Sequence, residues 1–104
     1  VGKPTQKQYH ERLTEIAGET VHFAGYIEER YLTSYYSQAD VYSTASLWEG
    51  CNLTVLEAQL VGTPVVAFDT GAHPETVQSP PGKLVRERDC TALGDAISHT
   101  INEP

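Results

Sequence analysis

The stretch NLTVLEAQLVGTPVVAF, from Asn52 to Phe68, contains the two kinds of element from which the fold is built. Its first half has apolar residues at positions i, i+3, i+7 and i+8, the spacing of an amphipathic helix that faces a core. These residues are Leu53, Leu56, Leu60 and Val61. Gly62 is expected to end this helix, and the apolar run at 64–68 predicts a strand buried on both faces, which is typical of parallel sheets.

Glu57 occupies the i+4 position of that apolar stripe, so the pattern puts a carboxylate on the face that should be buried. A glutamate at the edge of such a stripe is usually solvated. Position alone therefore leaves a rim salt bridge and a contact with a ligand equally plausible.

Outside this stretch, helical and extended patterns alternate along the chain. We expect helices at 5–17, 28–38 and 89–101, the last capped by Asp89, and strands at 20–24, 40–45 and 83–85. Strict alternation predicts an α/β fold, a parallel Rossmann-like sheet with helices on both faces, in one domain spanning 1–104. No strand precedes the first helix, so we expect a domain truncated at its N-terminal strand.

Composition limits the classes of function. The net charge of −7 argues against a nucleic-acid partner, and any anionic ligand needs a local binding device. No apolar run is long enough to span a membrane, so membrane contact is not expected through this domain. The two cysteines form neither a metal pattern nor a disulfide framework, and no signal peptide is visible, which indicates a cytoplasmic setting.

Open parallel sheets bind ligands beyond the carboxyl ends of their strands. The loop after the strand at 40–45 carries Glu49 and Gly50, and Asn52 can cap the helix that follows. The start of a helix attracts phosphate, which would supply the local device that the acidic chain needs. Glu57, just over one turn into the helix, could then accept hydrogen bonds from ribose hydroxyls, and Glu49 from those of a sugar.

Four segments match one family in the right order: HFAGYI at 22–27, SYYSQADVYSTASLWEG at 34–50, EGCNLTVLEAQLVGTPVVAFDTGAHPE at 49–75 and GKLV at 82–85. Together they resemble the donor-binding domain of family 4 retaining glycosyltransferases (glycosyltransferase group 1). Two positions depart from the family pattern E-G-F-G, where Cys51 and Asn52 replace the phenylalanine and the second glycine.

The resemblance implies an incomplete C-terminal half of a GT-B glycosyltransferase, which passes a hexose from a nucleotide-diphosphate sugar to an acceptor with retention. It implies that Glu49 is the catalytic residue and contacts the donor sugar, and that Glu57 holds the ribose. Other donor-binding positions implied are the diphosphate loop and helix start, Gly50, Cys51, Asn52, Leu53 and Thr54, and the turn against the nucleobase, Gly25 and Tyr26. No metal or cofactor is implied.

The implied partners are the nucleotide-sugar donor and an N-terminal acceptor domain of the same protein, so we expect residues 1–104 alone to be inactive. A nucleotide-sugar-binding module without catalysis and a nucleotide-sugar epimerase on the same fold remain alternatives. A receiver-like regulatory domain fits less well, because Asp40 opens its strand and does not end it. His73 is expected either to touch the donor sugar or to be an exposed loop residue, and His22 to be structural in its strand.

Overall fold

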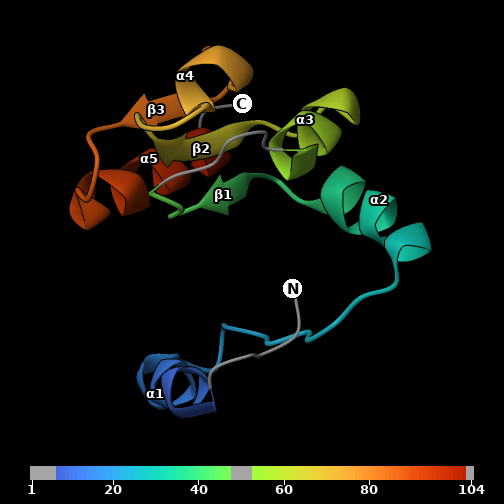
Figure 1. The fold of residues 1–104 in the computed structure, drawn as a ribbon, viewed down its shortest axis with the longest axis vertical. Coiled ribbons are helices and arrows are strands. Elements are labelled where there is room, and N and C mark those ends of the chain that lie inside the picture. The colour runs from blue at the N-terminus through green and yellow to red at the C-terminus, as the bar shows by residue number, and fades with distance from the viewer. Residues whose placement is uncertain (1–6, 48–52, 103–104) are drawn as a thin grey trace. The chain divides into compact units, whose positions relative to one another are not determined.

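The structure, a computed structural model, describes residues 7–47 and 53–102. The chain forms two compact units, Val1–Leu32 and Thr33–Pro104. The elements in chain order are α1 (Lys7–Ile16), α2 (Glu29–Gln38), β1 (Tyr42–Thr44), α3 (Leu53–Leu60), β2 (Val65–Phe68), α4 (His73–Thr76), β3 (Lys83–Val85) and α5 (Cys90–Asn102) (Figure 1).

The second unit is built on a three-stranded parallel sheet with the order β1-β2-β3. Ser43 lies opposite Val66, and Ala67 lies opposite Leu84. Each strand is followed by a helix, the usual crossover connection between parallel strands. The α/β class and the parallel sheet predicted from the alternating pattern are therefore confirmed.

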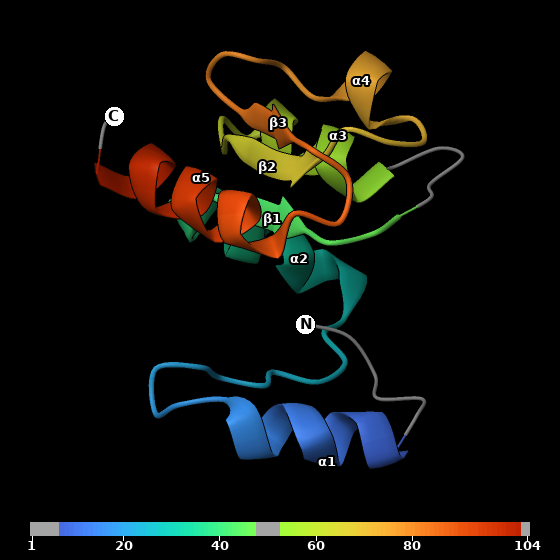
Figure 2. The ribbon, with the colours of Figure 1, turned by 90° about the vertical axis from the view of Figure 1, so that its left-hand side faces the viewer.

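The core of this unit lies on both faces of β2, all four residues of which are buried. On one face, Val65 and Ala67 pack in a cluster with Val55 and Ala58 of α3. On the other face, the cluster consists of Val66, Phe68, Val85 of β3 and Ala96 of α5. Figure 2 accordingly shows α5 in front of the sheet and α3 behind it. The alternating side chains of one strand thus serve two helical layers.

The buried face of α3 differs from the predicted one. Val55 and Ala58 are completely buried, whereas Leu53 is 61% exposed and Leu60 is 85% exposed. A small alanine lets the helix approach β2 closely, and this packing decides which face turns inward. The prediction that the leucine stripe faces the core is wrong. Glu57 shares the exposed side, so its carboxylate is not a buried charge.

The ends of the helices follow their sequence signals. At the end of α3, Gly62 has φ +86°, and the amides of Gly62 and Thr63 donate to the carbonyls of Gln59 and Ala58 (both 3.0 Å), the bonds of a Schellman motif. At the start of α5, Asp89 Oδ1 accepts the Ala92 amide at 2.9 Å, so the predicted N-cap is confirmed.

The first unit contains α1, as predicted, but no strand is formed at 20–24. Val21 and Phe23 are 51% and 40% exposed, and Phe23 contacts His10 edge-to-face at 5.2 Å between ring centroids. An extended segment becomes a strand only when a neighbouring backbone completes its hydrogen bonds. The predicted strand is therefore wrong for the described residues, and His22 is exposed. No described helix is both long and apolar enough to cross a membrane.

Candidate site at the carboxyl edge of the sheet

Three loops meet where the parallel strands end. They follow β1, β2 and β3, and α3 begins at the same edge because it continues from the first of them. Four of the predicted site residues in that loop fall outside the described part of the chain: Glu49, Gly50, Cys51 and Asn52. The described parts of the three loops define the edge on which a ligand would rest.

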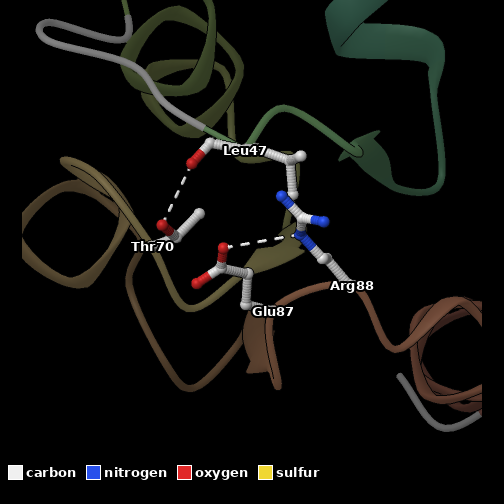
Figure 3. Close-up of polar contacts among 4 residues, drawn as sticks. All are labelled: Leu47, Thr70, Glu87 and Arg88. Carbon is white, nitrogen blue, oxygen red and sulfur yellow. Dashed lines mark hydrogen bonds and ion pairs between the residues drawn. The ribbon is translucent and has the colours of Figure 1, made fainter.

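Hydrogen bonds join these loops to one another. The Thr70 hydroxyl, just after β2, donates to the Leu47 carbonyl in the loop after β1 at 3.0 Å (Figure 3). The Asp69 amide donates to the Val85 carbonyl, the last residue of β3, at 2.7 Å. The turn after β2 is thus tied to both of its neighbours, which reduces the freedom of the edge before any ligand binds.

The buried side chain of His73 stabilises the turn after β2. Its side chain is completely buried, and Nδ1 lies 2.8 Å from the Phe68 carbonyl oxygen. A carbonyl oxygen only accepts, so Nδ1 carries the proton. The His73 amide also donates to the Thr70 carbonyl at 3.1 Å. The expectation of an exposed loop histidine is therefore wrong, and His73 supports residues 69–72 from the inside.

The first turns of α3 carry three predicted site residues: Leu53, Thr54 and Glu57, all of them exposed. Thr54 Oγ1 shares a hydrogen bond with the Tyr42 hydroxyl at 2.8 Å. Glu57 lies one turn further along the same face of the helix. Burial of the Tyr36 phenol raises its pKa, and the negative charge of Glu57 and then Tyr42 raise it further. Glu57 is thus an exposed carboxylate beside the half-buried Tyr36.

Gln59 is a structural residue that the sequence did not single out. Its amide nitrogen donates to the Thr76 carbonyl, and its amide oxygen accepts the Gln78 amide, both at 2.7 Å. The side chain therefore joins α3 to the end of α4. The role of Gln59 was not predicted because it lies outside the leucine stripe, and that stripe had been taken as the buried face of the helix.

Arg88 is the cation that sequence reasoning overlooked at this edge. It follows β3 in the third loop, and its Nε lies 3.8 Å from Oε1 of Glu87. Figure 3 shows its guanidinium group directed toward Leu47, beside the Thr70 contact. The sequence feature that could have identified Arg88 is the distribution of charge, because this acidic chain contains few lysine and arginine residues.

The predicted nucleobase turn belongs to the first unit. Gly25 has φ +72°, a backbone conformation that glycine adopts readily, and Tyr26 is 71% exposed.

A parallel α/β unit with loops joined at its carboxyl edge belongs to the class of folds that bind ligands at that edge. Comparison with known families makes this specific, because residues 1–103 match the family of glycosyl transferases group 1. The chain belongs to this family, as its sequence resemblance indicated.

Individual relatives agree with this assignment. The MMP alpha-(1->4)-mannosyltransferase of Mycolicibacterium hassiacum is 33% identical over 97% of this chain. The lipopolysaccharide core biosynthesis mannosyltransferase LpsB of Rhizobium meliloti is 32% identical over 94% of it. A GDP-mannose-dependent monoacylated alpha-(1-6)-phosphatidylinositol monomannoside mannosyltransferase of Corynebacterium glutamicum is 27% identical over all of it. The matched regions cover 24%, 28% and 29% of these relatives, respectively.

Proposed function

We propose that this chain is the donor-binding domain of a retaining glycosyltransferase, with a nucleotide-diphosphate sugar as donor. The observation that carries the proposal is the exposed Glu57, one turn into a helix that begins at the carboxyl edge of the sheet. A family that transfers sugars needs an oxygen-rich contact for ribose hydroxyls, and a carboxylate accepts from both members of a vicinal pair.

The roles proposed for the other residues follow from this contact. The partial positive charge at the start of α3, with Gly50 to Thr54, binds the diphosphate. Glu49 contacts the donor sugar as the catalytic residue, and Gly25 and Tyr26 contact the nucleobase. An N-terminal domain of the same protein binds the acceptor, so residues 1–104 alone do not catalyse the transfer of the sugar. These assignments are predictions for the full-length protein.

The relatives favour a particular donor. Two of the three named above are described as mannosyltransferases without a stated donor, and the third is described as GDP-mannose-dependent. We therefore propose mannosyl transfer from GDP-mannose as the first reaction to test. A binding module without catalysis would bind GDP-mannose but leave it intact, and an epimerase would convert the sugar without transferring it.

Replacement of the ribose contact tests the proposal. In the full-length protein, Glu57→Gln should weaken GDP binding by about 1.5–3 kcal/mol, because charge-assisted hydrogen bonds to the ribose are lost. Isothermal titration calorimetry measures this change. Asp95→Asn removes one negative charge from the exposed part of α5 and should leave the affinity unchanged. Equal GDP affinity in the wild type and Glu57→Gln would reject the ribose contact.

A further inference from the structure

Positive charge in the sheet-bearing unit is confined to one short segment. Beyond Leu32 the sequence has only three Lys or Arg residues, Lys83, Arg86 and Arg88, all within β3 and the loop that follows it. The chain as a whole carries −7, so its general field repels anions. Within this unit, a ligand phosphate at the carboxyl edge would therefore meet arginine side chains only in the loop after β3.

Arg88 is held in a backbone conformation that its side chain disfavours. Its φ is +67°, in the left-handed region that long side chains rarely adopt. Flanking hydrogen bonds fix this turn, with the Asp89 amide donating to the Arg86 carbonyl at 3.0 Å and the Cys90 amide donating to the Arg88 carbonyl at 3.1 Å. Glycine would occupy the position without strain, so the arginine side chain needs its own explanation.

Local contacts do not provide that explanation. The only ion pair that includes Arg88 among the described residues is with its neighbour Glu87, through Nε at 3.8 Å, and the arginine side chain is 74% exposed. An exposed pair of this kind adds little to stability. The guanidinium group instead points toward the Leu47 side chain, beside the place where Thr70 joins the first two loops (Figure 3).

We propose that Arg88 is a phosphate-binding residue of this edge. Its guanidinium group donates two hydrogen bonds to a phosphate of a ligand that lies over Leu47 and the turn after β2. The proposal rests on the proposed function for the site, and adds a residue that recognises anionic groups. The phosphate belongs either to the diphosphate of the donor or to a second, phosphate-bearing substrate, and the two arms of the experiment separate these sources.

The experiment measures binding to the full-length wild type, Arg88→Gln and Lys83→Gln. Lys83 is the matched control, because its replacement removes the same charge from the amino end of β3, whereas Arg88 lies in the loop beyond the carboxyl end of that strand. Isothermal titration calorimetry uses GDP in one arm and inorganic phosphate, with the protein saturated with GDP, in the other. Loss of one charge-assisted contact should weaken binding in one arm about 10-fold in Arg88→Gln and leave Lys83→Gln unchanged.

The affected arm identifies the source of the phosphate. Weaker GDP binding assigns Arg88 to the donor diphosphate, and weaker phosphate binding alone assigns it to a second substrate. Arg88→Gly is a second test: it should raise the melting temperature by relieving the left-handed strain, yet lose the same affinity as Arg88→Gln.

Three results would overturn the proposal for Arg88: unchanged binding in both arms, an equal loss in Lys83→Gln, or a wild type that binds neither probe. Failure of the proposed function is a different result. In that case the wild type transfers no mannose from GDP-mannose and binds no GDP, whether or not the binding of inorganic phosphate to the nucleotide-free protein depends on Arg88.

Discussion

Two apolar stretches of this chain predict strands equally well, and only one of them forms a strand. Val65–Phe68 becomes β2, paired with a strand on each side and fully buried. Thr20–Ala24 forms no strand: Thr20 lies in a turn, the Val21 amide donates to the Gly18 carbonyl at 3.2 Å, and Val21 and Phe23 are exposed. A strand is a property of the sheet as well as of its own sequence, because its backbone groups must be paired by neighbours.

The two phenylalanines of the chain give the largest test of this comparison. Phe68 is 2% exposed and Phe23 is 40% exposed. Phe68→Ala should lower the free energy of unfolding by about 3–5 kcal/mol, since it leaves a cavity between β2 and α5. Phe23→Ala should cost about 1 kcal/mol, mainly through its edge contact with His10. Urea denaturation measures both, and similar losses would contradict the burial difference.

The two faces of α3 give a smaller test. Val55→Ala should lower the free energy of unfolding by about 2 kcal/mol, because it removes buried methyl groups that pack on β2. Leu60→Ala should change it by less than about 0.5 kcal/mol, because that side chain is mostly in solvent. If Leu60→Ala proved the more damaging change, the face predicted from the leucine stripe would be the buried one after all.

The smallest effect concerns alkaline pH. The pKa of the Tyr36 phenol is raised above the ordinary tyrosine value, by burial first and by the charge of Glu57 second. A raised folded-state pKa means that the stabilisation is complete below the unfolded-state pKa and is lost as pH rises through the folded-state value. Tyr36→Phe should therefore lose less stability above pH 10 than the wild type.

Thermal unfolding between neutral and alkaline pH tests this expectation, with Tyr35→Phe as the matched control. Tyr35 is the neighbouring residue and is 46% exposed. The raised pKa of Tyr36 would be contradicted if Tyr36→Phe lost as much stability at alkaline pH as the wild type, or if Tyr35→Phe abolished that loss.

Much of the fold was predictable because its signals are local. Gly62 ends α3 and Asp89 caps α5 through hydrogen bonds that those residue types make. The apolar run of β2 predicts burial on both faces, which the sheet provides. The inward face of α3 was not predictable in the same way, since its stripe of leucines looked stronger than the pair Val55 and Ala58. Close packing on β2 favoured the smaller residues.

The candidate site was predictable only in part. The carboxyl edge follows from parallel strands, and the position of Glu57 on α3 follows from the helix. The support from His73 did not follow, because burial of a loop histidine depends on a carbonyl that only the folded turn presents. Arg88 was missed for a related reason. Its place beside Leu47 depends on a left-handed turn that its residue type does not favour.

Hydrogen–deuterium exchange of the full-length protein, with and without saturating GDP, shows whether the nucleotide binds at the carboxyl edge of the sheet. We expect slower exchange in peptides covering 45–57, 69–77 and 86–90, because these peptides include the described residues of the carboxyl edge and the first turns of α3. Peptides from the amino ends of the strands, at 39–42 and 78–83, should exchange as before. GDP binding that left the first three peptides unchanged, or that protected only the amino ends, would contradict the account.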